Sequence, residues 1–253
     1  MIRSVARPMN AKWHRHHRLR YRRTLLIMAA VLLLAGTLAA GGYFAGVSWP
    51  ALADALIRTT YRLAASYLLA LALGVALALL VGWSPVADYL FPVFDILQNI
   101  PSFALIPLFI YFFGATDEMI ILFAVSSIIW PILFAVLTAI RGAHVDLSDA
   151  ATVYGARGWR RVPYYLAPLS YPAILTGSVV GIAIGWEAVI GAEIIVAAIG
   201  ATTGFGAFIA EAGASGLNAA TIAGTLSILL LVFVVNRLVW APLLAESSYR
   251  YGE

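Results

Sequence analysis

The chain has 253 residues, of which 62% are hydrophobic and 11% charged, and its mean hydropathy is +0.92. A soluble domain of this length carries about 25% charged residues, so the composition excludes a water-soluble globule and an intrinsically disordered chain. The absence of cysteine excludes a disulfide scaffold and a zinc site built on thiolates. The class that remains is an all-α polytopic membrane protein.

Residues 1–23 form a basic tail. It holds eight of the sixteen basic residues and no acidic one, whereas the rest of the chain has eight arginines against twelve acidic residues. We interpret the tail as a cytoplasmic segment that rests on anionic membrane lipid, where each charge contributes about 1 kcal/mol. Nucleic-acid binding is disfavoured because an apolar run follows the tail without a spacer.

Six apolar segments are long enough to cross a membrane, because a span needs roughly 20 mostly apolar residues. The first contains no charge and is predicted to be an uncleaved anchor helix. The third contains Pro101 and Pro107, which predict a kink packed against neighbouring helices. The predicted transmembrane helices are 24–47, 61–82, 96–113, 119–140, 167 to about 192, and 219–244.

The distribution of Lys and Arg predicts the orientation of these spans. If the N-terminus is cytoplasmic, fourteen of the sixteen basic residues lie on the cytoplasmic face, and only Arg58 and Arg62 lie outside. The reverse topology would export fourteen. Both termini are therefore expected in the cytoplasm.

The chain has no phosphate-binding loop of the GxxxxGK[ST] type, because Lys12 in the tail is its only lysine. If ATP drives transport, ATP and Mg²⁺ must bind a separate subunit. Carboxylates near the outer end of the fifth span, Glu187 and Glu193, leave open a proton-coupled secondary carrier. Their place near the outer boundary, where hydration is cheap, disfavours a proton relay. A membrane scaffold that recruits a cytosolic partner through its basic tail is a third possibility.

Small residues recur at every fourth position in two spans, which lets helix backbones approach closely. One ridge contains Ala70, Gly74, Ala78 and Gly82. The other ridge contains Gly177, Gly181 and Gly185, and it either packs against a helix or lines a solute pathway. Hydroxyl groups and helix N-termini could hold an anion there, although Ser and Thr in spans often bond their own backbone. The pathway candidates are Ser102, Thr176, Gly177, Ser178, Gly181, Gly185, Glu187 and Glu193.

The interior loop 141–166 is predicted to contain two short helices joined by a glycine bend. Asp146 is a candidate N-cap, with Asp149 three residues later. A helix is expected over 147–154, with Gly155 as its left-handed terminator. A second basic segment, 158–166, leads back into the membrane. The pair forms a projecting knob suited to a groove on a partner, unless it is an amphipathic loop that lies on lipid.

The residues Asp149-Ala150-Ala151, Gly155, Pro168 and Pro172 resemble the "EAA" loop in permease subunits of bacterial ATP-binding-cassette importers. In that family the loop is a coupling helix that seats in a cleft of the ATPase subunit. This chain departs from the pattern with Asp149 where Glu is usual and with Ala167 where Leu is usual. The resemblance implies coupling residues Asp149, Ala150, Ala151, Gly155 and Arg157.

The segment 100–114 resembles the "IP..A..PLFI.WFG" signature of the nitrate, sulfonate, taurine and bicarbonate branch. Trp186, Ala192-Glu193 and Gly204-Phe205-Gly206 match its "W…AE…GLG" pattern, although the chain is a few residues longer before Gly204. The resemblance covers roughly residues 55–250 and implies a MetI-like (type I) permease core with a cytoplasmic coupling helix.

The same resemblance implies a subunit of the bacterial inner membrane that carries a small anion and has no enzymatic activity, metal or cofactor of its own. Its implied partners are a second permease copy, two ATPase subunits, and a periplasmic or lipid-anchored solute-binding protein.

Overall fold

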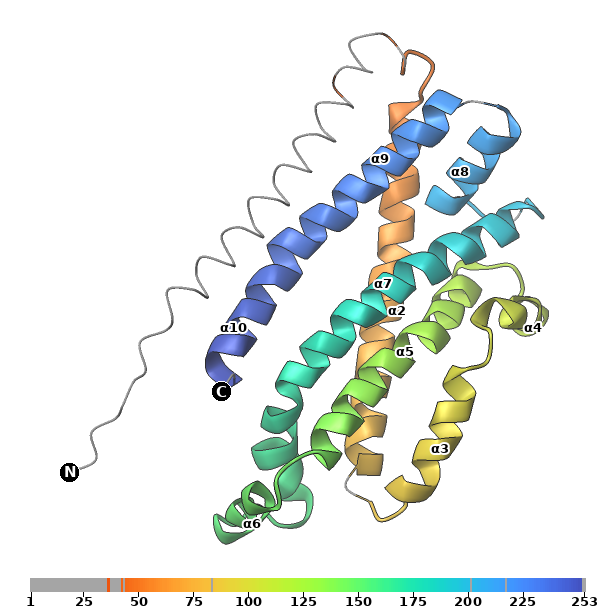
Figure 1. Ribbon diagram of the computed structural model, residues 1–253. Helices are drawn as coiled ribbons and strands as arrows, with labels where there is room; N and C mark the ends of the chain where they lie inside the picture. Colours follow the sequence, from red (N-terminus) through yellow and green to blue (C-terminus); the bar gives the residue numbers. More distant parts are fainter. Residues whose placement is uncertain are drawn as a thin grey trace. The chain divides into compact units, whose positions relative to one another are not determined.

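The computed structural model describes residues 36, 42, 44–82, 84–200, 202–216 and 218–251, with only the backbone at 218 and 248–251. The predicted tail at 1–23 and nearly all of the predicted anchor helix at 24–47 lie outside these residues. The chain divides into two units, 1–47 and 48–253, and the description below concerns the second. Within its described residues every regular element is helical, as the composition predicts (Figure 1).

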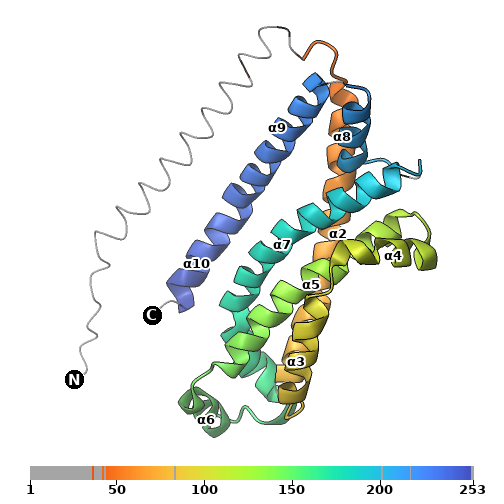
Figure 2. The same ribbon diagram turned by 45° about the vertical axis from the view of Figure 1, so that its right-hand side comes forward.

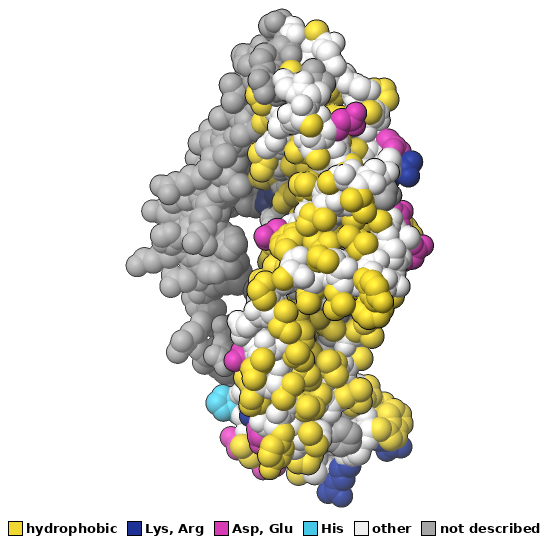
Figure 3. All heavy atoms as spheres, turned by 90° about the vertical axis from the view of Figure 1, so that its right-hand side faces the viewer, with side chains coloured by type: hydrophobic (Ala, Val, Ile, Leu, Met, Phe, Trp, Pro, Cys, Tyr) yellow, Lys and Arg dark blue, Asp and Glu magenta, His cyan; other side chains and the backbone are white. Residues whose placement is uncertain are grey.

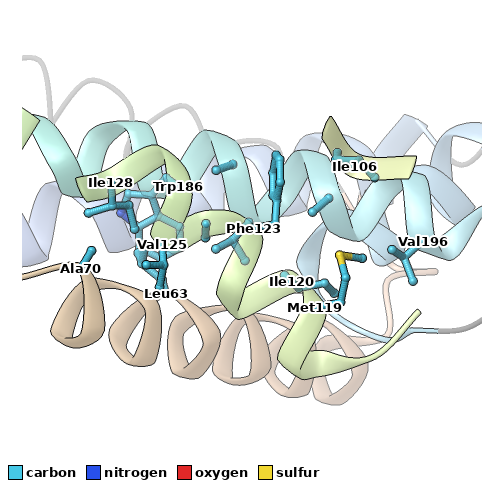
Figure 4. Close-up of a cluster of buried hydrophobic side chains, with 14 of the residues drawn as sticks. Leu63, Ala70, Ile106, Met119, Ile120, Phe123, Val125, Ile128, Trp186 and Val196 are labelled. Carbon is cyan, nitrogen blue, oxygen red and sulfur yellow. The ribbon is translucent and has the colours of Figure 1, made fainter. Parts of the chain in front are cut away.

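Three long helices form the centre of this unit: α2 (Trp49–Gly82), α5 (Asp117–Arg141) and α7 (Ala167–Ala197). Helix α5 packs along both α2 and α7, and its side chains Phe123, Ile128 and Ile132 are completely buried. Figure 4 shows this cluster, in which Ile128 and Phe123 of α5 lie among side chains from α2 and α7. The three predicted spans at 61–82, 119–140 and 167–192 are therefore confirmed as helices, although α2 begins twelve residues earlier than expected.

The remaining elements lie along the sides and at the two ends of this three-helix centre (Figures 1 and 2). The "α6 end" is the end where α5 stops and α7 begins, and the "α8 end" is the opposite one. The elements are α3 (Ala87–Gln98), η1 (Ser102–Leu105), α4 (Ile106–Phe113), α6 (Val145–Val153), η2 (Gly158–Arg160), η3 (Val162–Leu166), α8 (Phe205–Ala214), α9 (Asn218–Val235), η4 (Asn236–Trp240) and α10 (Ala241–Tyr251). Of these, α9 and α10 run along one side of the centre and α3 along another (Figures 1 and 2).

The predicted third span, 96–113, is not one kinked helix. The chain forms α3, which begins at Ala87, and then η1 with α4, and the two arms are bent by 82°. Pro101 explains the break, because a proline disfavours the helical conformation of the residue before it and lacks a hydrogen-bond donor. Pro107 lies in the first turn of α4, where a missing N–H group costs nothing.

Two π-turns, η3 and η4, were not foreseen, and each ends two residues before a proline. Pro168 follows η3 and Pro242 follows η4. A proline ring inside a helix clashes with the carbonyl four residues earlier, which in both cases belongs to the π-turn. The wider turn accommodates that carbonyl and lets α9, η4 and α10 continue as one rod. The last predicted span, 219–244, is thus confirmed with a local irregularity.

Four helical stretches of the described residues are long and apolar enough to cross a membrane, or five if the bent pair counts as one span. Figure 3 shows a broad apolar surface on one face, with charged side chains at its margins and ends. Exposed side chains such as Leu68, Leu80 and Leu229 would be costly in water and suit a lipid environment. The unit is therefore a polytopic membrane protein.

Candidate functional site

At the α6 end, a short helix forms a projecting knob, here defined as residues 142–166. Helix α6 begins at Val145 with His144 as its N-cap, so the predicted cap at Asp146 is wrong. Asp146 instead lies in the first turn, where its negative charge still favours the helix dipole. The sequence therefore predicts an acidic residue at the start of this helix correctly, but the helix begins two residues earlier than the predicted cap implies.

Gly155 ends the helix as the sequence predicts. Its φ angle is +86°, a left-handed conformation that favours glycine. The N–H of Gly155 donates to the carbonyl of Thr152 at 3.1 Å, and the N–H of Ala156 donates to the carbonyl of Ala151 at 2.9 Å. This pair of bonds is the Schellman motif, which satisfies carbonyls at a helix end and reverses the chain.

The surface of the knob is unusually apolar for an exposed loop. Tyr154 is 91% exposed, Val153 82% and Trp159 73%. A depression of about 730 Å³ lies beside them, lined by Ala151, Tyr154, Gly155, Ala156, Trp159, Arg160 and Tyr164. Exposed apolar patches of this kind mark interaction surfaces.

The predicted coupling residues lie together on this knob. Asp149, Ala150, Gly155 and Arg157 are exposed and Ala151 is half-buried. Arg161 is different, because its guanidinium bonds to the hydroxyl of Ser148 in α6 and lies 5.5 Å from the ring centre of Tyr165. Arg161 thus braces α6 against the start of the following helix.

At the α8 end, a buried ion pair joins α2 to α7. Arg62 is 2% exposed and Glu193 is completely buried, and Nη1 of Arg62 bonds to Oε1 of Glu193. Thr59 lies 2.8 Å from both carboxylate oxygens. A buried charge is tolerated when it is paired and hydrogen-bonded. These contacts pair both groups and satisfy the carboxylate, whereas Nε of Arg62 is buried without a hydrogen-bond partner among the described residues.

The same groups hold the start of α8. Oε2 of Glu193 accepts from the N–H of Gly206 at 2.8 Å, and Oγ1 of Thr59 accepts from the N–H of Phe205 at 2.8 Å. First-turn N–H groups have no partner inside their own helix, so side chains from α7 and α2 serve as its cap. A carboxylate there is also favoured by the helix dipole.

Arg62 extends the network to the surface. Its Nη1 donates to the carbonyl of Thr203 at 2.6 Å, and its Nη2 donates to Asp117 at 2.6 Å and to Oγ1 of Thr202 at 3.1 Å. Asp117 begins α5 and is 54% exposed. One arginine therefore ties together α2, α5, α7 and the loop that precedes α8.

Two glycines permit this close packing. Gly204 has a φ angle of +152°, and a Cβ there would lie 2.6 Å from Nη1 of Arg62. A Cβ at Gly206 would lie 2.7 Å from the Cβ of Glu193. The backbone at Gly204 and Gly206 therefore approaches the ion pair so closely that a side chain at either position would clash.

Sequence reasoning missed this network. It placed Glu193 at a hydrated boundary, whereas the side chain has no exposed surface. It used Arg58 and Arg62 only to predict the orientation of the spans. In the structure their environments differ, because Arg58 is half-exposed and pairs with Asp54 one turn away, whereas Arg62 is buried. The available signal was a charge within an apolar helix together with the Ala-Glu and Gly-Phe-Gly motifs.

The structure distributes the pathway candidates over different surfaces. Gly177, Gly181 and Gly185 face α5, and a Cβ at Gly177 would lie 2.8 Å from the carbonyl of Pro131. Ser178 is buried, Ser102 is half-buried at the start of η1, and Thr176 bonds its own backbone at Pro172. Glu187 is exposed and does not join Glu193. No cluster of three or more His, Asp or Glu that could hold a metal occurs in the described part of the chain.

Residues 70–240 match the family described as "Binding-protein-dependent transport system inner membrane component". The chain is 27% identical over 211 residues to the taurine transport system permease protein of Escherichia coli (strain K12). This alignment covers 83% of this chain and 73% of that protein. It is 29% identical over 182 residues to the nitrate import permease protein of Leptolyngbya laminosa, covering 70% and 63%.

A third relative is the bicarbonate transport system permease protein of Synechococcus elongatus, 28% identical over 182 residues, which covers 72% of this chain and 63% of that protein. The chain thus spans just under two thirds of the nitrate and bicarbonate relatives.

The match defines a multi-pass component of an inner-membrane transport system. The chain belongs to this family of permeases of bacterial ATP-binding-cassette importers, within the branch of the nitrate, sulfonate, taurine and bicarbonate permeases. The family is one of transporter subunits and not of catalytic enzymes.

Proposed function

We propose that two copies of this chain form the membrane pathway of an importer for a small anion, and that two separate ATPase subunits drive it by docking on the knob. The observation that carries the coupling role is the exposed knob itself, where Tyr154 and Trp159 surround a Schellman bend at Gly155. An apolar surface beside exposed arginines fits a cleft on a partner protein.

The solute class is inferred from the names of the relatives. They are permeases for taurine, nitrate and bicarbonate, and each of these solutes carries an anionic group. In this scheme a periplasmic or lipid-anchored binding protein delivers the solute, and ATP and Mg²⁺ bind only to the ATPase subunits.

The orientation belongs to the same proposal. Arg157, Arg160 and Arg161 lie in the knob, and positive charge accumulates on cytoplasmic loops. The knob is thus assigned to the cytoplasm, together with both termini, and the α8 end to the periplasm. The alternative of a proton-coupled carrier loses one of its two carboxylates, because Glu193 is held by Arg62, Thr59 and the start of α8.

Substitution at Gly155 tests the coupling role. Gly155→Val forces a β-branched residue into a left-handed conformation, which costs at least about 1–2 kcal/mol and distorts the bend. We expect this variant to reach the membrane but to hydrolyse ATP without uptake, in vesicles that contain the complete importer.

Gly155→Asn is the matched control, because asparagine tolerates positive φ and no other atom lies within 4 Å of the added Cβ. It should retain coupled uptake. Normal uptake by the valine variant would contradict the assignment of the knob, and uptake driven by a pH gradient in the absence of the ATPase would favour the secondary carrier.

A further inference from the structure

Glu187 is an exposed carboxylate on α7 that has no hydrogen-bond or ion-pair partner among the described residues. It contrasts with Glu193, six residues later on the same helix, which is buried and fully bonded. The network at the α8 end therefore does not account for Glu187.

Glu187 lies deeper in the membrane-spanning part of α7 than the outer boundary predicted for it from the sequence. Gly185, two residues earlier, packs against Ile128 of α5. Ile128 is eleven residues from Asp117 and thirteen from Arg141, the charged ends of α5, which at 1.5 Å per residue is roughly 16 and 20 Å. An ionised carboxylate at that depth is strongly unfavourable against lipid and requires water, a partner or a ligand.

The exposed face of α7 beside Glu187 carries Thr176, Ala183 and one larger apolar side chain, Val180, which is 47% exposed. Thr176, Val180, Ala183 and Glu187 are all exposed, at the spacing that aligns residues along one side of a helix. The buried ridge of Gly177, Gly181 and Gly185 lies on another side, against α5. This face differs from the outer surface of α9, where Leu229 and Leu230 are exposed.

We propose that the face Thr176–Val180–Ala183–Glu187 lines the solute pathway, and that Glu187 selects a solute with a protonated amine beside its anionic group. The inference rests on the proposed function. In a two-fold symmetric pair each copy contributes one Glu187, and the two carboxylates together attract a cation and oppose a plain anion.

No arginine offers an obvious neutralising partner at this depth. Arg62 lies next to Leu63, which Gly185 contacts, but its guanidinium is already bonded to Glu193, Asp117 and Thr203. Arg237 in η4 is engaged in an interaction of its own, and the other arginines whose side chains are described lie towards the ends of the spans. The chemistry that remains for Glu187 is recognition of a cationic group on the solute, so the solute class narrows from small anions to zwitterions.

Thiol labelling of the complete importer in membrane vesicles tests the proposal, because the native chain contains no cysteine. Ala183→Cys places a single thiol one turn from Glu187, and Leu229→Cys on α9 is the lipid-facing control. The probes are a trimethylammonium and a sulfonate methanethiosulfonate reagent of similar size. We expect both reagents to label the cysteine at 183 and neither to label the one at 229.

The charge of Glu187 is tested by adding Glu187→Gln to the labelled variant. The ratio of cationic to anionic labelling rates at position 183 should fall roughly tenfold, since one charge at about 6 Å acts through a partly aqueous medium. An unreactive thiol at 183, or a ratio that Glu187→Gln leaves unchanged, overturns the proposal.

The solute class is tested by protection of the same thiol. Taurine, an aminosulfonate, should slow labelling more than ethanesulfonate, which lacks the amine, and Glu187→Gln should abolish that difference. Equal protection by both solutes, or none by either, contradicts the assignment. If Gly155→Val keeps normal coupled uptake, the proposed function fails. If coupling holds and the charge ratio does not change, only the present inference fails.

Discussion

Arg62 and Glu193 show how two ionised side chains are accommodated inside an apolar helix bundle. The carboxylate accepts bonds from Thr59, Arg62 and the N–H of Gly206, and the guanidinium is also bonded to Asp117 and Thr203. Desolvation makes a buried pair weak evidence for net stability, but loss of one partner leaves an uncompensated charge. Removal of one partner alone is therefore expected to destabilise the fold more than removal of both.

Arg62→Met should lower the free energy of unfolding of the detergent-solubilised protein by about 3–5 kcal/mol, and its melting temperature with it. The reason is that Glu193 is left buried without its partner charge. Arg58→Met is the control, since that exposed pair with Asp54 contributes at most about 1 kcal/mol. The double variant Arg62→Met with Glu193→Leu should recover part of the loss. Equal melting temperatures for Arg62→Met and Arg58→Met would show that the buried pair is not coupled.

The sequence predicts the residues of the knob far better than those of this network. Gly155 and the Asp149-Ala150-Ala151 run are local, and a helix followed by a left-handed glycine can be read from neighbouring residues. Arg62 and Glu193 are 131 residues apart, and no local pattern states which charges on different spans will meet. Burial of Glu193 depends on the whole arrangement of α2, α7 and α8.

At the scale of elements, helix packing depends on small residues of α2 and α7 where these helices contact α5. Gly74 and Gly82 of α2 pack against Ile129 and Ile140, and Gly177 of α7 packs against Pro131 and Ile132. Such contacts allow close van der Waals packing, which is the main attraction between helices in lipid. The fourfold spacing of small residues predicts the close contact, but it does not say which helix is contacted.

Gly177→Ala should destabilise the α5–α7 pair by about 1–3 kcal/mol, because its Cβ would lie 2.8 Å from the Pro131 carbonyl and 2.9 Å from Cα of Ile132. In α8, Gly213→Ala meets nothing within 4 Å and should be neutral or slightly stabilising. Melting of the two purified variants gives the comparison. A Gly177→Ala protein as stable as Gly213→Ala would mean that these helices pack less closely than described.

The spans themselves follow from long apolar runs, but their irregularities do not. The π-turns before Pro168 and Pro242, and the 82° break at Pro101, show three prolines that distort a helix in two different ways. Which distortion occurs depends on the packing available to the freed carbonyl groups, and tertiary contacts decide it.

At the scale of the molecule, the described unit has two chemically different ends. The α6 end carries an exposed apolar knob, and the α8 end carries a buried ion pair whose arginine also holds Thr202 and Thr203 before α8. We expect the first to transmit movement of a partner and the second to hold its own end rigid. A ligand or partner can shift such a structure only by binding its two conformations with different affinity, so contact at the knob is the central claim.

Site-specific cross-linking at the knob tests this claim most directly. In the naturally cysteine-free chain, Val153→Cys places a thiol at an 82% exposed position of the knob, and Glu211→Cys places one at an exposed position of α8. In membranes that contain the complete importer, a bifunctional thiol reagent should join the ATPase subunit to position 153 and not to position 211. Cross-linking only at position 211, or at neither position while ATP-driven uptake continues, would contradict the account.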